Sequence, residues 1–185
     1  MTRLGRQNFP DVEFGINAGD HPRGGASFNY CSPKSGVPLW LWPDYMFFAW
    51  PEIAAPTWAQ QLRRAAELDV TLPFSQRNNK VFWRGGGGPL VREKLVSRFA
   101  NRTDIAGVAK IPPFGALRTE LMNNPDYNIS NIITRLEDFC RYKYIIHTEG
   151  NTWSVRLKSH LICGGVVISH PLQWAAVDTE ILEEG

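Results

Sequence analysis

The chain has 185 residues, of which 43% are hydrophobic and 21% are charged, and its formal net charge is +2. This composition is typical of a globular protein and excludes a disordered one, while the length allows one large core or two small lobes. The small net charge gives no support for binding to nucleic acid or to a membrane surface, and the apolar runs are too short to span a bilayer.

The first part of the chain, to about residue 60, is rich in Gly, Pro and Trp and predicts mostly extended structure. Val12–Ala18 predicts a short buried strand that ends in a turn at Gly19–Pro22, because proline disfavours helix at the residue before it. Prolines and aromatic residues then alternate through an extended region. Thr57 has the character of a helix N-cap, and Trp58–Leu68 predicts the helix that follows it.

The second part of the chain alternates between strand and helix patterns. Lys80–Trp83 predicts a strand that ends in Arg84 and the run Gly85–Gly88. Pro89 suits the first position of a helix that continues to Ala100. Further on, the patterns predict a helix, a strand, a helix and a strand at residues 131–141, 144–148, 153–163 and 166–170. This order predicts an α/β lobe with a mostly parallel sheet whose apolar strands are covered by helices on both faces.

The three cysteines, Cys31, Cys140 and Cys163, lie far apart and form no Cys-x-x-Cys pair. This spacing argues against a metal cluster built on thiolates. Two alternatives remain open at this point: one disulfide bond in an oxidising compartment, or three buried thiols.

Two segments match the Asn-x-Ser/Thr acceptor sequence for N-glycosylation, Asn101–Thr103 and Asn128–Ser130. Because such short matches also arise by chance, they favour a secretory compartment only slightly. The N-terminus shows no basic start followed by an apolar stretch, which a signal peptide requires. For a secretory protein, we therefore expect the leader and any membrane tether to lie outside this chain.

The segment around Gly150 is a candidate phosphate-binding turn. A strand, a glycine turn and a helix that begins near Ser154 form an arrangement in which unpaired N–H groups bind phosphate. Arg156 and Lys158 would add charge-assisted hydrogen bonds to a diphosphate. The alternative, in which Ser154 only caps the helix and the two cations lie on a solvated face, is equally open.

Two further places are candidates for chemistry. The glycines after Arg84 would let a ligand approach the backbone closely, although they match neither a Walker A loop nor a dinucleotide fingerprint, and a plain connection is the alternative. Asp20 follows the predicted strand at its carboxyl end, where it is either a general base or a turn residue beside His21. The chain has no Asp-x-Asp triplet, so positive side chains and helix dipoles are the expected counter-charge for a diphosphate.

Together these residues resemble glycosyltransferase family 90, which includes the Rumi-type protein O-glucosyltransferases and the fungal capsule-associated proteins. The resemblance extends from about residue 10 to 175 and is most specific from 137 to 167. The segments that carry it are Asn17–Pro22, Pro43–Phe48, Phe82–Gly85, the pair Arg92-Glu93, Glu137–Tyr144, Gly150, Trp153–Lys158 and Gly165–Val167. The sequence departs from the family pattern in its glycine run, which replaces a more polar stretch, and in Glu93, where Asp is common.

The resemblance implies a GT-B-like α/β fold with two Rossmann-like lobes and the active site in the cleft between them. Residues 1–75 would be the remainder of an incomplete N-terminal, acceptor-side lobe, and residues 76–185 a truncated C-terminal nucleotide-sugar-binding lobe. The implied reaction is an inverting, metal-independent transfer of a sugar, glucose or xylose, from a UDP-sugar to a hydroxyl of a protein or glycan acceptor. No cofactor and no nucleic-acid partner are implied. The implied compartment is the lumen of the endoplasmic reticulum or Golgi.

The resemblance also implies roles for particular residues. Asp20 corresponds to the family's general base. The donor-binding residues that it implies are Arg84, Gly85, Ser154, Arg156 and Lys158, and no metal ligand is implied. The alternative is a truncated, catalytically inactive homologue that at most binds a nucleotide or a glycan.

Overall fold

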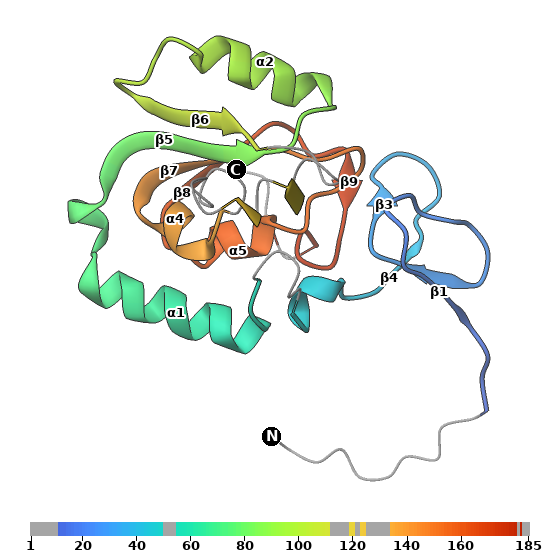
Figure 1. Cartoon of the computed structure of the whole chain (residues 1–185). Helices are drawn as coiled ribbons and strands as arrows, with labels where there is room; N and C mark the ends of the chain where they lie inside the picture. Colours follow the sequence, from blue (N-terminus) through green and yellow to red (C-terminus); the bar gives the residue numbers. More distant parts are fainter. Residues whose placement is uncertain are drawn as a thin grey trace.

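The computed structural model describes residues 11–49, 55–111, 119–120, 123–124, 134–180 and 182. Over these residues the chain forms a mixed α/β structure with two parallel sheets and one antiparallel pair of strands (Figure 1). The predicted α/β class with parallel strands is therefore confirmed.

The larger sheet has four parallel strands in the order β6-β5-β7-β8. Its strands are β5 (Asn78–Gly85), β6 (Ala106–Lys110), β7 (Tyr142–His147) and β8 (Val166–Ser169). From β5 the chain moves outward to β6, and it later returns past β5 to form β7 and β8 on the other side. This reversal of direction is the mark of a doubly wound α/β sheet.

Helices lie on both sides of the larger sheet. The described residues include α1 (Trp58–Thr71), α2 (Leu90–Phe99), α4 (Leu136–Cys140) and α5 (Leu157–Leu161), with 3-10 turns η1 (Tyr45–Phe47) and η3 (Phe74–Gln76). In Figure 1, α2 lies on one side and α1, α4 and α5 lie on the other. Right-handed crossovers produce this division, because the chain moves in opposite directions from β5 to β6 and from β6 to β7.

Helix α1 begins where the sequence predicts. The Thr57 hydroxyl accepts the N–H of Gln60 at 3.4 Å, and the Gln60 side chain accepts the N–H of Thr57 at 3.0 Å. This reciprocal capping box satisfies two N–H groups that otherwise lack partners at a helix start. The helix continues to Thr71, three residues past the predicted end, and packs against α4.

The main core lies between β5, β7 and the helices on the α4 side. Phe82 of β5 and Ile145 of β7 pack with Phe139 of α4, and the Phe82 and Phe139 rings meet edge to face at 5.2 Å. Leu68 of α1 closes the cluster. Burying these side chains is the largest favourable contribution to the stability of this part of the fold.

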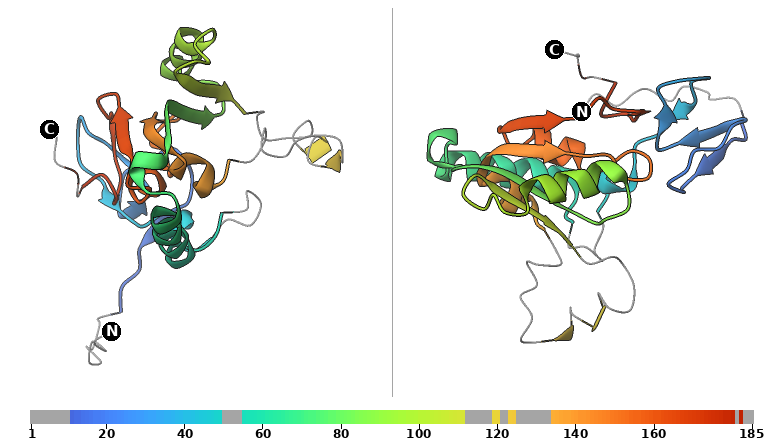
Figure 2. Two further views of the ribbon diagram at one scale, coloured as in Figure 1. Left: turned by 90° about the vertical axis from the view of Figure 1, so that its left-hand side faces the viewer. Right: turned by 90° about the horizontal axis from the view of Figure 1, so that it is seen from above.

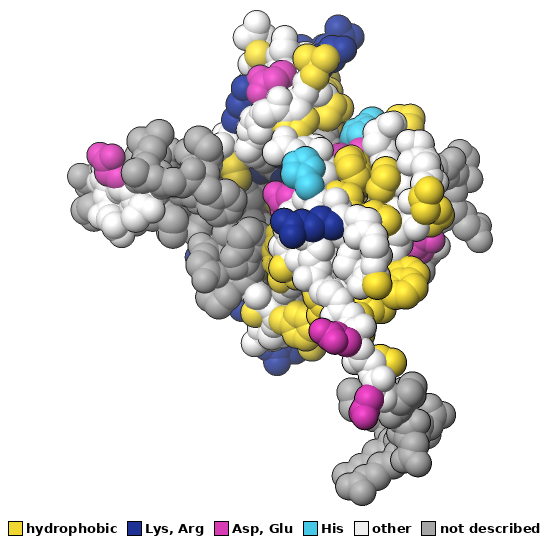
Figure 3. All heavy atoms as spheres, turned by 90° about the vertical axis from the view of Figure 1, so that its right-hand side faces the viewer, with side chains coloured by type: hydrophobic (Ala, Val, Ile, Leu, Met, Phe, Trp, Pro, Cys, Tyr) yellow, Lys and Arg dark blue, Asp and Glu magenta, His cyan; other side chains and the backbone are white. Residues whose placement is uncertain are grey.

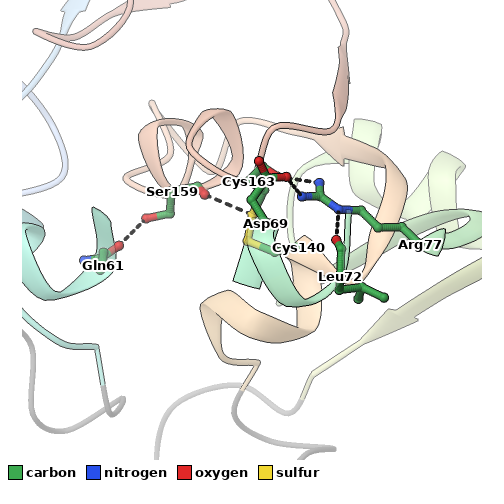
Figure 4. The surroundings of a disulfide bond; sticks show 7 residues. All are labelled: Gln61, Asp69, Leu72, Arg77, Cys140, Ser159 and Cys163. Atoms are coloured by element: carbon green, nitrogen blue, oxygen red, sulfur yellow. Dashed lines mark hydrogen bonds and ion pairs between the residues drawn. A yellow bond between two sulfur atoms is a disulfide. The ribbon is translucent and has the colours of Figure 1, made fainter. Parts of the chain in front are cut away.

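A disulfide bond joins Cys140 at the end of α4 to Cys163 just after α5 (Figure 4). Of the two alternatives left open by the sequence, the structure therefore contains the disulfide, while Cys31 is a buried free thiol. The Arg77 guanidinium lies beside the bond, where it donates to the Cys163 carbonyl and pairs with Asp69 at 2.7 Å. These contacts hold α1, α4 and α5 together as one layer.

A smaller parallel sheet lies beside the larger one and does not continue it (Figure 2). Its strands, in the order β1-β2-β4, are β1 (Gly15–Asn17), β2 (Ser27–Asn29) and β4 (Trp40–Leu41). A separate antiparallel pair is formed by β3 (Ser32–Pro33) and β9 (Trp174–Ala175). This pair brings the C-terminal part of the described chain against the N-terminal part.

Several predicted elements differ from the structure. Val12–Ala18 was expected to be a buried strand, but β1 spans only three residues and Ile16 within it is 52% exposed. Pro89 is the N-cap of α2 and not its first helical residue. The helix expected at 153–163 is reduced to α5, because residues 150–156 form a turn and loop. Strand β6 was missed.

Candidate active site

The candidate active site lies where the strand order of the larger sheet reverses. The carboxyl ends of β5 and β7 are neighbours, and the chain leaves them in opposite directions. In doubly wound sheets this point opens a crevice in which ligands bind. Two loops leave the sheet here, residues 86–89 after β5 and residues 148–156 after β7.

A pocket of about 490 Å³ occupies this position. One wall is formed by loop 86–89 and Arg92 of α2, the floor by residues 150–155, and the opposite wall by Asp20 and Tyr45. Its size lies within the range of small-molecule sites in proteins. The two loops of the larger sheet therefore face a segment that comes from the smaller sheet. We refer to this pocket as the cleft.

The glycine run shapes the first wall for two different reasons. A Cβ atom on Gly85 would lie 2.6 Å from the ring of Trp83, which is fully buried. Gly88 has a φ of +119°, a conformation that side-chain-bearing residues rarely adopt. Gly85 is thus a packing requirement behind the cleft, while the backbone of Gly86 and Gly87 lines the cleft itself.

Arg92 lines the cleft, although it was not among the donor-binding residues that the family resemblance implied. Its Nη1 donates to the Gly86 carbonyl at 3.1 Å, and its Nε donates to the Glu149 carbonyl at 2.9 Å. Burial lowers the pKa of this guanidinium, and no carboxylate within the described ranges pairs with it. The adjacent Glu93 pairs instead with Lys110 at 2.5 Å. A cation without a paired carboxylate therefore lies between the two loops. In the sequence, only the Arg92-Glu93 pair of the family pattern had indicated a role for this residue.

The floor of the cleft is a loop and not a helix start. The N–H of Gly150 donates to the Trp153 carbonyl at 3.3 Å, which closes a tight turn. Ser154 lines the cleft, and α5 begins only at Leu157 with no side-chain cap. The floor of the cleft is consequently formed by loop residues and includes Ser154, while the start of α5 lies outside it.

Asp20 is held at the opposite wall through its backbone. The Thr152 hydroxyl donates to the Asp20 carbonyl at 2.8 Å, across a sequence separation of 132 residues. The buried side chain of Asn29 fixes the same loop by accepting from Asn17 and from the N–H of Arg23. The Asp20 carboxylate is exposed to the cleft and makes no hydrogen bond or ion pair with the described part of the chain.

Tyr45 lies on the same wall as Asp20. Its ring packs edge to face against Tyr30 at 5.6 Å. Burial, followed by the negative charge of Asp20, raises the pKa of the phenol. Tyr45 is therefore an uncharged residue in the lining of the cleft.

The arginines expected to bind the donor lie behind the cleft. Arg84 lies over the Phe82 ring at 4.7 Å and donates to the Trp83 and Gly107 carbonyls. It lines a separate pocket beside α4. Arg156 donates to the Arg84 carbonyl and to the Ser154 hydroxyl, the latter at 3.4 Å. Burial lowers its pKa to about 9. In this structure Arg156 braces the end of β5 against the cleft floor.

Lys158 forms a buried ion pair. Its ammonium lies 2.6 Å from the Asp44 carboxylate, and both side chains are at most 5% exposed. Lys158 also donates to the Val155 carbonyl and lies 5.0 Å from the Phe47 ring centroid. Asp44 in turn accepts the N–H of Met46. The pair holds the segment that carries Tyr45 against α5. Lys158 itself does not line the cleft and affects it only by positioning these neighbouring residues.

Glu149 supports the cleft floor from below. Its buried carboxylate accepts the N–H groups of Gln173 and Trp174, at 3.0 Å and 2.9 Å. The N–H of Glu149 donates to Nε2 of His170, and the His170 Nδ1 lies 2.9 Å from the Pro171 carbonyl. The position of Glu149, and hence of Arg92, thus depends on the chain around β9.

The described chain gives three further observations. On the face shown in Figure 3, Lys and Arg side chains are separated from one another and form no continuous stripe. Within the described ranges, no three His, Cys, Asp or Glu side chains are grouped as metal ligands. No described helix is long and apolar enough to cross a membrane.

A doubly wound parallel sheet with a glycine loop, an unneutralised arginine and a cleft at its reversal point is typical of nucleotide-binding α/β proteins. The sequence model of Glycosyl transferase family 90 matches residues 1–182, and the chain belongs to this family. It is similar to O-glucosyltransferase rumi of Drosophila melanogaster, with 23% identity over 187 residues. That match covers 89% of this chain and 43% of the relative. The chain therefore spans less than half the length of that relative.

Proposed function

We propose that this chain carries the active site of an inverting glycosyltransferase that moves a sugar from a UDP-sugar to an acceptor hydroxyl without a metal ion. The observation that carries the proposal is the cleft, in which a glycine loop and an arginine face a carboxylate on the opposite wall. Family membership supports the reaction class. The name of the similar O-glucosyltransferase supports glucose as the first sugar to test, with xylose as the second.

The donor diphosphate fits the wall and floor that belong to the larger sheet. Gly86, Gly87 and Ser154 line this space, and their backbone N–H groups and the Ser154 hydroxyl are the donors that we propose for the phosphate oxygens. Arg92 uses part of its guanidinium to hold two carbonyl groups, and its remaining N–H groups are donors for phosphate oxygens. These donors would neutralise the charge that grows on the departing UDP, which is the role a metal ion has in other transferases.

The acceptor belongs on the Asp20 side of the cleft. The Asp20 carboxylate would take the proton from the acceptor hydroxyl while that oxygen bonds to the anomeric carbon. At the same time the bond from this carbon to the UDP oxygen breaks, and UDP leaves with the electron pair. Because attack and departure occur on opposite faces of the sugar, the configuration at the anomeric carbon is inverted.

The two walls also support a GT-B-like arrangement. Asp20 and Tyr45 belong to the N-terminal segments around the smaller sheet, whereas the donor side belongs to the larger sheet. Thr152, the Asp44–Lys158 pair and the β3–β9 strand pair hold these segments together. We infer that the cleft is the interface of two lobes, with Arg84, Arg156 and Lys158 positioning its loops from behind.

The disulfide supports the compartment. Disulfides such as the Cys140–Cys163 bond persist in the secretory pathway and are rare where thiols are kept reduced. The lumen of the endoplasmic reticulum or Golgi is therefore the proposed location. Protein or glycan hydroxyls are the proposed acceptors.

Calorimetric titration with UDP in EDTA tests the donor site. We expect wild type to bind and Arg92→Gln to bind about ten-fold or more weakly, because a charge-assisted hydrogen bond contributes about 1.5–3 kcal/mol. Arg92→Lys should restore part of the affinity. Lys94→Gln on the same helix, which removes a charge outside the cleft, is the matched control. Equal affinity of Arg92→Gln and Lys94→Gln would overturn the placement of the diphosphate.

The alternative function is a catalytically inactive homologue that only binds nucleotide. The two functions differ in what Asp20→Asn does. In an active enzyme this change leaves UDP affinity intact and lowers transfer from UDP-glucose by about 100-fold or more, because a general base is lost. A wild type that binds UDP but transfers no sugar from either donor to any protein or glycan acceptor would favour the inactive homologue.

A further inference from the structure

Asn101 lies in an exposed turn between α2 and β6. It belongs to the N-glycosylation acceptor sequence Asn101–Thr103, which has no part in the proposed sugar transfer. Asn101, Arg102 and Thr103 are all exposed. The side chains of Asn101 and Thr103 make no hydrogen bond to the described residues, so both are open to solvent. An accessible Asn-x-Thr in a turn is the setting in which an N-linked glycan is accommodated on a folded protein.

We propose that Asn101 is an N-glycosylation site of this protein. The inference rests on the luminal compartment of the proposed function, which the Cys140–Cys163 disulfide supports independently of the sequon. The Asn101 amide nitrogen would form a bond to C1 of a lipid-linked oligosaccharide and lose one proton to a base of the transferase, while the bond from C1 to the lipid diphosphate breaks and the lipid diphosphate leaves with the electron pair. The host cell's own transferase supplies this step.

The turn keeps its shape without the two side chains that the modification needs. The N–H of Arg102 donates to the Phe99 carbonyl at 3.0 Å, and the N–H of Ala106 donates to the Arg102 carbonyl at 2.9 Å. Lys80 donates to Thr103 at 2.7 Å, but it does so at the backbone carbonyl. Changes to the side chains of Asn101 or Thr103 therefore remove the acceptor sequence while all of these contacts remain.

The site is also remote from the cleft. Strands β5 and β6 are parallel, and Ala106 at the start of β6 pairs with Val81, whereas Lys110 at its end pairs with Gly85 beside the cleft. At about 3.3 Å per residue, the strand separates the turn from the cleft edge by about 13 Å. A glycan on Asn101 would extend from the amino end of the sheet and leave the cleft open.

The test expresses the full chain in a eukaryotic cell behind a cleavable secretion signal. Ser130→Ala removes the second acceptor sequence, whose residues lie outside the described ranges. A C-terminal tag with its own acceptor sequence reports import into the lumen, and only chains with a glycosylated tag are scored. The readout is the mobility shift that N-glycanase removes, with the modified residue identified by peptide mass spectrometry.

We expect the Ser130→Ala parent to carry two glycans, one on the tag and one on Asn101. Asn101→Gln and Thr103→Ala should each carry only the tag glycan, while the matched control Thr103→Ser should retain a second glycan on part of the molecules. A parent that carries only the tag glycan would overturn the proposal. UDP titration on unglycosylated chain from bacteria tests the proposed function separately, so neither failure implies the other.

Discussion

Removal of the disulfide gives the sharpest test of the fold. Replacing Cys140 and Cys163 together by alanine frees the ends of α4 and α5 from one another. The two residues are 23 positions apart. In the chain-entropy model, closing a loop of that size lowers the entropy of the unfolded chain and thereby raises its free energy by about 3.4 kcal/mol at 25 °C. The free energy of unfolding should therefore fall by about 3 kcal/mol, with a further loss from the cavities left at two buried positions.

Urea unfolding followed by tryptophan fluorescence, with and without reductant, separates the two contributions. Reductant should lower the stability of wild type by about 3 kcal/mol, which corresponds to a drop in melting temperature of about 6–12 °C for a chain of this size. The double alanine variant should not respond to reductant. The difference between this variant and reduced wild type then measures the cavities alone.

The control for the pairing is Cys31→Ala. Because Cys31 is a free buried thiol, this variant should keep the full response to reductant. Loss of that response, or a response of wild type below about 1 kcal/mol, would refute the assigned bond and the link between α4 and α5.

Three other perturbations probe the framework of the cleft. Lys158→Met leaves the buried Asp44 carboxylate without its cation and should cost about 3–5 kcal/mol in urea unfolding, part of which Asp44→Asn restores. Gly85→Ala drives a methyl group into the Trp83 ring and should destabilise by about 1–3 kcal/mol in thermal unfolding. Burial, followed by the charge of Arg156, lowers the pKa of His147 to about 3. Between pH 7 and pH 5 the unfolded state takes up a proton at His147 that the folded state does not. This residue alone should therefore lower the free energy of unfolding by about 2 kcal/mol over that range, and the total fall should be smaller by that amount in His147→Gln.

The elements that local patterns determine were predictable. The capping box at Thr57 and Gln60 depends on two side chains three residues apart, so the sequence locates the start of α1. The apolar runs of β5 and β7 were found because strands that are largely buried are continuously hydrophobic. The run of β8 was found in the same way, although Val166 and Ile168 are exposed in the structure. Strand β6, at the sheet edge, consists of small residues and one lysine, and this pattern does not distinguish it from a loop.

Long-range pairing was not predictable from the single sequence. The sequence places Ser154, Arg156 and Lys158 at alternate positions. This spacing does not indicate which residues each side chain contacts in the folded chain. Lys158 finds its partner Asp44 at a separation of 114 residues, and the disulfide likewise depends on two helices packed side by side. The prediction of a helix over 153–163 failed at its start, because the turn at Gly150 and the burial of Trp153 take up the first residues. Tertiary contacts override local propensity in such a segment.

The same contacts explain why the counter-charge for a diphosphate is better sought on α2 than on α5. A cation that is already paired with a buried carboxylate, as Lys158 is, would lose that pair in order to bind phosphate. Among the described residues, the partners of Arg92 are two carbonyl groups, one on each of the two loops that border the cleft. It therefore holds the loops at a fixed separation and keeps its full charge for a ligand. A diphosphate would meet a guanidinium already in place, at little cost in side-chain entropy, which is the condition under which one charged group contributes most to binding.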